Sequence, residues 1–338
     1  MQDTITNPSE KVSRRDFLKI TAVAGLSLGL GVASARRWLE KGDFVKITET
    51  HYLMGTVINF SVLASDKDQG QRAIQATRAE MERLITIFDH RNPNTQLAKL
   101  NSTGSLDQPS FELVALLQRA LGISTLTSGA FDITVKPLVD ALRDGEDDYL
   151  SLLELVDYRK ILIKDAQIKF TQPNMSVTLD GIAKGHIVDG GVAVLRSLGF
   201  ESVLVEAGGD MLASSDSVEK HDWKIGINNP RFTKKPDYIA DFSINNQAVA
   251  TSGDYVHHFS SDFSQHHIIN PHSGFSPTQL SSVTVIAPSA TEADALSTAL
   301  MVLGVDDGLA FVEKLSGVEA LFATKDQALY HSVGFPAI

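Results

Sequence analysis

The segment from Thr291 to Gly304, TEADALSTALMVLG, constrains the fold more than any other part of the sequence. Its alanines and leucines favour a helix whose apolar surface belongs in a core. Asp294, Ser297 and Thr298 stand at i, i+3 and i+4, so they project from one helix face. Burying a carboxylate there is costly unless it is paired or bound to a cation. The acid therefore either complements the helix dipole as a cap or joins the hydroxyls in holding a hard cation such as Mg2+.

The N-terminus carries an export signal. Residues 13–19, SRRDFLK, have the twin-arginine pattern, and the following run 20–35 is uncharged. That run is shorter than the about 20 apolar residues that span a membrane, and Ala33-Ser34-Ala35 offers a cleavage site. We predict a twin-arginine signal peptide at 1–35, a short linker at 36–50 and one catalytic domain at 51–338. The mature protein is expected in the periplasm, and the alternative is an uncleaved anchor that keeps it at the inner membrane.

Composition excludes several classes of protein. The chain has no cysteine, which excludes disulfides, thiolate metal sites and a cysteine nucleophile. Its formal net charge is −11, and no basic stripe with interleaved aromatic residues occurs. Nucleic acid and anionic lipid are therefore not expected as partners.

The pattern of apolar residues predicts long helices beside strands that look antiparallel. Helices are predicted at 66–88, 109–121, 137–160 with a solvated break at 144–148, 184–198 and 291–304, and strands at 55–64, 202–206, 223–227, 239–244, 247–251, 282–287, 318–323 and 328–332. Residues 90–104 are predicted to be a polar loop. This order indicates an α+β fold with mixed helices and a largely antiparallel sheet, rather than regular βαβ winding.

Glycine-containing loops lie at the edges of predicted elements, at 128–132, 179–185, 206–210 and 250–255. Glycine allows the backbone to approach a ligand closely, although each loop taken alone is also compatible with a plain turn. None is a Walker loop or a GxGxxG fingerprint. Gly181 and Lys184 open a helix, so an anionic group could meet both the helix N-terminus and the ammonium.

Histidines crowd between His257 and His272, in a spacing that fits no zinc signature. His267 is the best functional candidate among them. It precedes the apolar pair Ile268-Ile269 and then Asn270-Pro271, which would hold its imidazole at a strand edge beside a turn.

Seven motifs occur in one order along the chain. They are MGT at 54–56, SGAFD at 128–132, GIAKG at 181–185, VEAGGD at 205–210, ATSGDY at 250–255, HIINPHSG at 267–274 and EADALSTAL at 292–300. From about Met54 to the C-terminus, the chain resembles the ApbE family of FAD:protein FMN transferases. The resemblance implies a T-fold-like α+β fold that forms a single catalytic unit of two lobes. It also implies a Mg2+-dependent enzyme with FAD as substrate, which places FMN on a threonine hydroxyl of an acceptor protein and releases AMP.

The resemblance also assigns residues. The implied metal ligands are the backbone carbonyl of Gly181 and the side chains of Asp294, Ser297 and Thr298. The implied cofactor-binding residues are Met54, Arg91, Ala130, Phe131, Asp132, Lys184 and Ile268. His267 is the implied general base, and Asp180 and Asp254 remain alternatives between which the sequence does not choose. The chain departs from the family pattern at Thr178 and Asn270, where aspartate is common, and at Arg91, where tyrosine is common.

The same metal site serves more than one activity. The implied acceptors are electron-transfer flavoproteins or subunits of respiratory sodium pumps that carry a flavinylated threonine. The alternatives are an FAD pyrophosphatase, which uses water as the acceptor, and a periplasmic FAD carrier without catalysis. The acceptor alone separates the transferase from the pyrophosphatase.

Overall fold

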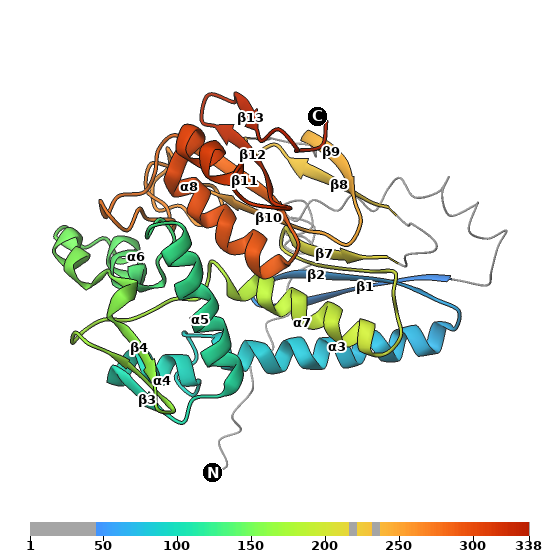
Figure 1. Cartoon of the computed structure of the whole chain (residues 1–338), viewed down its shortest axis with the longest axis horizontal. Coiled ribbons are helices and arrows are strands. Elements are labelled where there is room, and N and C mark those ends of the chain that lie inside the picture. The colour runs from blue at the N-terminus through green and yellow to red at the C-terminus, as the bar shows by residue number, and fades with distance from the viewer. Residues whose placement is uncertain (1–44, 216–221, 232–236, 338) are drawn as a thin grey trace, which may run out of the picture.

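The computed structural model describes residues 45–215, 222–231 and 237–337 (Figure 1). The predicted signal peptide and residues 36–44 of the predicted linker lie outside this range. The strand β1 (Val45–Leu53) begins inside that linker and pairs with β2 (Thr56–Ala64) over its whole length. Residues 45–50 therefore belong to the sheet, and the predicted linker is too long by that segment.

The fold is built on one open sheet of eight strands in the order β1-β2-β6-β7-β10-β11-β12-β13. Every pairing in it is antiparallel, and β1 and β13 form its two edges, so it does not close into a barrel. The remaining strands are β6 (Val203–Ala207), β7 (Asp210–Ser214), β10 (Ala248–Gly253), β11 (Leu280–Ala287), β12 (Glu319–Thr324) and β13 (Leu329–His331). The predicted α+β class with a largely antiparallel sheet is confirmed.

Helices and a hairpin cover the two faces of this sheet. On one face α3 (Lys67–Phe88) packs against β1 and β2, α7 (Ala183–Ser197) against β6 and β7, and α8 (Ala290–Val312) against β10 and β11 (Figure 1). The other face is covered by the hairpin of β8 (Trp223–Asn228) and β9 (Tyr238–Ile244). Alternating strand residues supply the two cores, since Val249 joins the hairpin's cluster while its neighbours Ala248 and Ala250 join the helix side.

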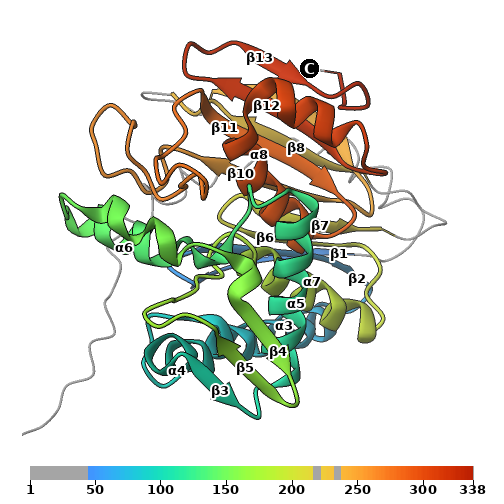
Figure 2. The ribbon, with the colours of Figure 1, turned by 60° about the vertical axis from the view of Figure 1, so that its left-hand side comes forward.

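A second unit, which we call the small lobe, lies beside the sheet and is teal to green in Figures 1 and 2. It contains α4 (Gln96–Thr103), α5 (Phe111–Leu126), α6 (Lys136–Asp144) and a three-stranded sheet of β3 (Ser105–Asp107), β5 (Gln167–Phe170) and β4 (Ile161–Lys164). Leu113 and Ile168 of the small lobe share one continuous core with Phe60 and Leu300 of the large sheet and its helices. The two lobes are therefore joined by a common core.

Several predicted elements need correction. Residues 90–104 are not all loop, because they contain α4, and the predicted helix 137–160 ends at Asp144 and is followed by 3₁₀ turns. The strands β3, β4, β5 and β7 were not predicted. The helix at 291–304 continues to Val312, but the backbone at Gly304 is not helical, with φ 79° and ψ −170°.

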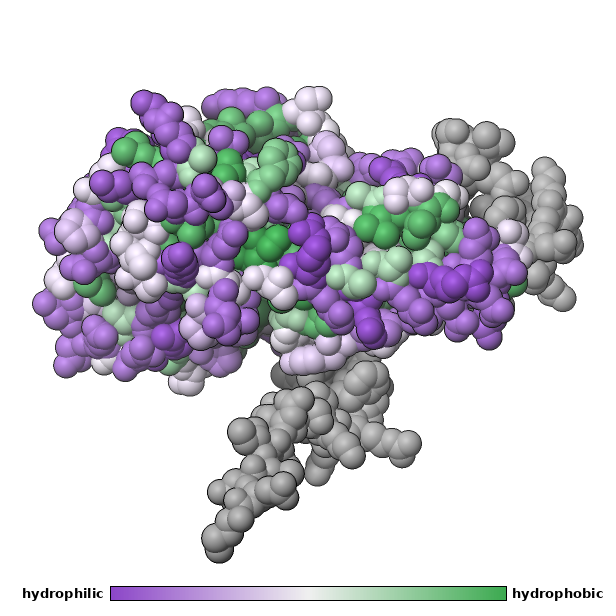
Figure 3. Space-filling model, turned by 90° about the horizontal axis from the view of Figure 1, so that it is seen from below, coloured by the Kyte–Doolittle hydropathy of each residue, from purple (hydrophilic) through white to green (hydrophobic). Residues whose placement is uncertain are grey.

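Within the part of the chain that the structure describes, α8 alone is long and apolar enough to span a membrane. Half of its most apolar window is buried in the protein, as expected for the central helix of a core. The face seen in Figure 3 is mainly hydrophilic, with separate hydrophobic patches rather than a continuous apolar band.

Candidate active site

A cleft opens between the two lobes. Its space is about 1100 Å³, counting the part that is open to solvent. Figure 2 shows α6 of the small lobe and the segment between β10 and β11 on the same side of the molecule, and both contribute to the lining. Most of the predicted site residues line this cleft: Arg91, Ala130, Phe131, Asp132, Asp180, Gly181, Lys184, His267, Ile268, Asp294 and Thr298. Met54, Asp254 and Ser297 are not part of the lining.

The N-terminus of α8 is capped by residues other than Asp294. Ser289 is the N-cap, and its hydroxyl accepts a hydrogen bond from the amide of Glu292. Asp189 of α7 accepts from the amide of Ala290 at 2.8 Å and from both the amide and the hydroxyl of Thr291. Asp294 is thus not needed as a cap, and its carboxylate is available for another role.

Asp294 is a buried carboxylate at the base of the cleft, with 5% of its surface exposed. Its Oδ2 accepts a hydrogen bond of 2.9 Å from the amide of Gly185 on α7. Burial raises the pKa of Asp294 well above its usual value, and the nearby carboxylate of Asp210 raises it further. A bound cation would remove this penalty.

Three hydroxyl groups lie together about one helical turn beyond Asp294. Ser252 at the end of β10 lies with its Oγ 2.8 Å from the Oγ of Ser297 and 3.1 Å from the Oγ1 of Thr298. The backbone of Gly181 is adjacent, since a Cβ added there would lie 3.1 Å from the Oγ1 of Thr298. Ser297 is fully enclosed, and its hydroxyl donates to the Asp294 carbonyl oxygen at 2.8 Å. Ser297 as a direct ligand stays a prediction, and Ser252, which sequence analysis missed, lines the cleft whereas Ser297 does not.

The predicted metal ligands that line the cleft form a set that fits Mg2+. The Asp294 carboxylate, the Thr298 hydroxyl and the Gly181 carbonyl are all oxygen donors, which is the chemistry that hard cations prefer. Among the described residues, no group of three or more His, Cys, Asp or Glu is placed to hold a metal ion. The fit thus depends on combining one raised-pKa carboxylate with hydroxyl and carbonyl oxygens.

Lys184 supplies positive charge to the cleft. Its Nζ lies 3.0 Å from the Oδ2 of the buried Asp210 and donates a longer hydrogen bond to the Gly208 carbonyl oxygen. Burial acts against its charge, but Asp210 and Asp294 outweigh that effect and raise the pKa of Lys184. The ammonium therefore stays charged and can meet an anionic group. Asp210 was missed as a site residue, although it ends the VEAGGD motif.

His267 presents a neutral imidazole. Its Nδ1 lies 3.1 Å from the carbonyl oxygen of His257, which also accepts the His267 backbone amide at 2.9 Å. A carbonyl partner requires Nδ1 to carry the proton, which leaves the lone pair on Nε2. Burial, followed by the neighbouring His257, lowers the pKa of His267 to about 4. The ring is thus a proton acceptor at neutral pH.

Asp180 lies at the rim of the cleft and is held by the side chains of Arg91 and His90. Arg91 donates two hydrogen bonds to its carboxylate, of 3.2 and 2.7 Å, and His90 lies 3.2 Å from Oδ2. Partial burial opposes ionisation, but the bonds from His90 and Arg91 outweigh it and hold the pKa of Asp180 below its usual range. Both carboxylate oxygens are already engaged by these donors, which leaves Asp180 less free than His267 to take a proton.

Asp132 and Met54 have mainly structural surroundings. Asp132 accepts hydrogen bonds from the amide and hydroxyl of Thr134 and from the amide of Tyr158, so it fixes the loop that carries Phe131. Met54 occupies the turn between β1 and β2 with φ 54°, a conformation that non-glycine residues rarely adopt. It packs against the core and does not line the cleft, so direct flavin contact by Met54 is not supported in this structure.

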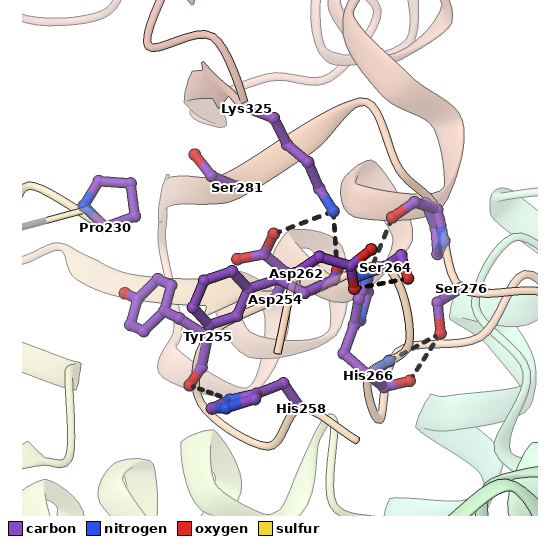
Figure 4. Close-up of polar contacts among 12 residues, drawn as sticks. Pro230, Asp254, Tyr255, His258, Asp262, Ser264, His266, Ser276, Ser281 and Lys325 are labelled. Carbon is purple, nitrogen blue, oxygen red and sulfur yellow. Dashed lines mark hydrogen bonds and ion pairs between the residues drawn. The ribbon is translucent and has the colours of Figure 1, made fainter. Parts of the chain in front are cut away.

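Asp254 does not line the cleft, and Figure 4 shows its carboxylate facing the Lys325 ammonium. It is fully buried, and Arg231 donates two hydrogen bonds to its carboxylate, of 2.9 and 2.7 Å. Lys325 lies 3.4 Å from its Oδ2. A carboxylate that is paired with two cations and does not line the cleft is poorly placed to take a proton from a substrate there, so the geometry does not support Asp254 as the base.

Comparison with known proteins gives a consistent result. The model of the ApbE family matches residues 54–322, and the model of the twin-arginine translocation signal matches residues 11–31. A Treponema pallidum protein named FAD:protein FMN transferase is 33% identical over 299 residues, which are 78% of this chain and 82% of that protein. A Klebsiella pneumoniae protein of the same name is 29% identical over 292 residues, which are 81% and 88% of the two chains.

The solved structures that resemble this one are also ApbE proteins. The ApbE protein of Thermotoga maritima superimposes with a TM-score of 0.77 at 28% identity and covers 86% of this chain and 98% of its own. The flavin transferase ApbE of Vibrio cholerae gives a TM-score of 0.74 at 26% identity, with the same coverage. Because the family model matches most of the chain and the cleft contains the family's motifs, the chain belongs to the ApbE family.

Proposed function

We propose that this protein is a Mg2+-dependent FAD:protein FMN transferase. It cleaves the pyrophosphate of FAD, attaches FMN to a threonine hydroxyl of an acceptor protein and releases AMP. The observation that carries this proposal is that one cleft brings together the oxygens of Asp294 and Thr298, the Lys184 ammonium and the neutral imidazole of His267. The names of the relatives support the same reaction.

The residues of the cleft have separate roles in binding. Phe131 and Ile268 supply apolar surface that suits a flavin ring. Lys184, in the first turn of α7, places its charge where the pyrophosphate is negative. Asp294, Thr298 and the Gly181 carbonyl would hold Mg2+, which neutralises phosphate charge and assists the departure of AMP.

His267 activates the acceptor. Its Nε2 takes the proton of the threonine hydroxyl as the oxygen attacks the phosphorus of the FMN half of FAD. A phosphoester bond forms there, and the bond from the same phosphorus to the bridging oxygen breaks, so that AMP leaves with the bonding electrons. The proton then passes from His267 to solvent, and no oxidation or reduction takes place.

The export signal supports a periplasmic location for this reaction. Twin-arginine export would deliver the protein to the periplasm, either free or held at the inner membrane by an uncleaved signal. We infer that the acceptors are periplasmic electron-transfer flavoproteins or sodium-pump subunits with an accessible threonine.

An acceptor assay tests the proposal. The purified protein is incubated with FAD, MgCl2 and a candidate electron-transfer acceptor, and intact mass spectrometry follows the acceptor. We expect an acceptor mass increased by FMN less water, one AMP per transfer, and no increase when the acceptor threonine is replaced by valine. Release of AMP and free FMN with an unmodified acceptor would instead identify an FAD pyrophosphatase.

A further inference from the structure

The proposed base lies at one end of a compact loop. We call residues 255–267 the histidine hairpin, because its two arms pair with each other: His258 bridges His266, and the amide of Phe259 donates to Gln265 O at 2.7 Å. At its open end, the His257 carbonyl oxygen accepts hydrogen bonds from both the backbone amide and the Nδ1 of His267. The orientation of the His267 ring therefore depends on the two arms keeping their register.

The tip of the histidine hairpin is held in an unfavourable backbone conformation. Phe263 has φ 59°, in the left-handed region that favours glycine. The carboxylate of Asp262 bonds to Ser260 and Ser264 within the tip, but these contacts are local. A phenylalanine stays in such a conformation only when surrounding contacts hold it there.

Two cations from distant parts of the chain hold Phe263. Lys325, in the turn after β12, donates a hydrogen bond of 2.7 Å to the Phe263 carbonyl oxygen. Arg231, in the segment after β8, lies over the Phe263 ring at 4.6 Å from its centre. Such a contact between guanidinium and ring is attractive.

Both cations are fixed by Asp254. Arg231 bonds to both carboxylate oxygens of Asp254, and Lys325 lies 3.4 Å from one of them, as the dashed line in Figure 4 shows. Asp254 is fully buried, and the side chains of Arg231 and Lys325 are largely buried as well, with 18% and 25% of their surface exposed. Charge pairs of this kind are strongly orienting, because removing one member leaves a buried charge without its partner.

Asp254 also lies in the sequence between the residues beside the proposed metal site and the histidine hairpin that carries His267. Ser252, two residues earlier, contacts Thr298, and Val256, two residues later, lines the cleft. The carboxylate is therefore anchored at the point where the end of β10 becomes the first arm of the histidine hairpin.

We propose that Asp254, Arg231 and Lys325 form a clamp on Phe263 that holds the histidine hairpin and thereby positions His267 for proton transfer. These three are positioning residues, and none of them contacts the substrate. The inference rests on the proposed function for its effect on turnover, but the orientation of His267 can be measured without turnover.

Nuclear magnetic resonance of the histidine side chains tests the clamp. Long-range 1H–15N correlation spectra report the tautomer and pKa of His267, whose signal is assigned by its loss in His267→Gln. Lys325→Met is compared with wild type, with Lys325→Arg as the conservative rescue and with Lys314→Met, which removes an exposed lysine elsewhere. The titratable groups that act on His267 are His257, His266 and Asp180, and all are retained in these variants.

We expect wild type to show the Nδ1-protonated tautomer and a pKa of His267 of about 4. In Lys325→Met, the tautomer becomes mixed, the pKa rises toward its ordinary value of about 6.5, and kcat for FMN transfer falls about tenfold while KM for FAD is unchanged. Lys325→Arg restores most of both properties, and Lys314→Met behaves as wild type.

A second variant keeps the test decisive if Lys325→Met does not fold. Phe263→Leu retains all three charges and removes the ring that lies under Arg231 and packs against the His258 ring of the first arm, and the same changes at His267 are expected. If folded Lys325→Met or Phe263→Leu leaves the tautomer, pKa and kcat unchanged, the clamp is refuted. A wild-type protein that transfers no FMN contradicts the proposed function, whereas the spectra still decide the clamp.

Discussion

At the scale of single residues, Asp294 carries the strongest chemical constraint. Asp294→Asn keeps the shape of the side chain but removes the charge that would hold a cation. We expect the dependence of the rate on Mg2+ to disappear and kcat/KM to fall about 100-fold or more. Initial rates of AMP release across a MgCl2 titration measure this, with Asp307→Asn as the control, because Asp307 is an exposed acid of the same helix that does not line the cleft. A normal Mg2+ saturation curve in Asp294→Asn contradicts the metal assignment.

His267 gives a prediction for the pH dependence. Its lowered pKa of about 4 means that the imidazole remains a proton acceptor at every pH above that value and loses this ability only as the pH falls through it. The acid limb of kcat/KM should therefore lie near pH 4, more than two units below that of an ordinary histidine.

The His267→Gln variant separates chemistry from binding. It should lower kcat about 10²- to 10⁴-fold, the usual contribution of a general base, while the affinity for FAD measured by fluorescence quenching stays the same. An acid limb that persists unchanged in His267→Gln would show that another group is the base.

The sequence predicted the chemistry of single residues better than their contacts. Asp294, Thr298, Gly181, Lys184 and His267 all lie in motifs and all line the cleft. Helical spacing could not show that the Ser297 hydroxyl would donate to a backbone carbonyl instead of pointing into the cleft. The clamp was also hidden, because Asp254 and Lys325 follow strands of the main sheet whereas Arg231 follows β8 of the separate two-stranded sheet, and the three meet only in the folded protein.

At the scale of elements, long periodic segments were predictable and short ones were not. The helices α3, α5 and α7 have long apolar stripes, and their predicted starts agree with the structure to within about two residues. The strands β3 and β5 are three and four residues long, too short for an alternating pattern to be recognised. The cap signals of α4 were present at Thr95 and Gly104, but the polar composition around them suggested a loop.

The contact between α7 and α8 gives a prediction at this scale. A Cβ at Gly185 would lie 2.1 Å from the Ala290 carbonyl oxygen and 2.9 Å from the Cβ of Asp294. Gly185→Ala should force the helices apart, destabilise the protein by about 1–3 kcal/mol and reduce kcat, because Asp294 moves away from Gly181. Thermal unfolding and AMP release measure the two effects.

The matched control is Gly122→Ala in α5. Nothing lies within 4 Å of a Cβ at Gly122, so this helical substitution should stabilise the protein slightly, by about 0.5–1 kcal/mol, without changing activity. Equal stability of the two alanine variants would contradict the tight helix contact.

At the scale of the whole molecule, the proposed metal site affects the free energy of unfolding. The raised pKa of Asp294 means that its ionised form destabilises the folded protein, so stability without metal should decrease as the pH rises above about 4. Mg2+ at about 100 times its dissociation constant should add about 2.7 kcal/mol. Asp294→Asn should unfold at a higher temperature than wild type without Mg2+ and gain nothing when Mg2+ is added. Calorimetry at pH 8 with and without MgCl2 measures both unfolding temperatures. A larger rise in unfolding temperature on adding Mg2+ in the variant than in wild type contradicts the prediction.

The arrangement of the two lobes explains why the whole chain is needed. Phe131 comes from the small lobe, Lys184 and Asp294 from helices on the large sheet, and His267 from the segment between its strands β10 and β11. The sequence placed these motifs in order, but only the fold shows that they meet in one cleft. A common core beneath that cleft keeps the lobes in a fixed relation.

The most direct test of this account is the mass of an acceptor protein after incubation with the purified chain, FAD and MgCl2. We predict a single addition of FMN on one threonine peptide, matched by an equal amount of AMP and abolished by EDTA. A flavoprotein acceptor with an accessible threonine that stays unmodified while FAD is consumed would contradict the central claim.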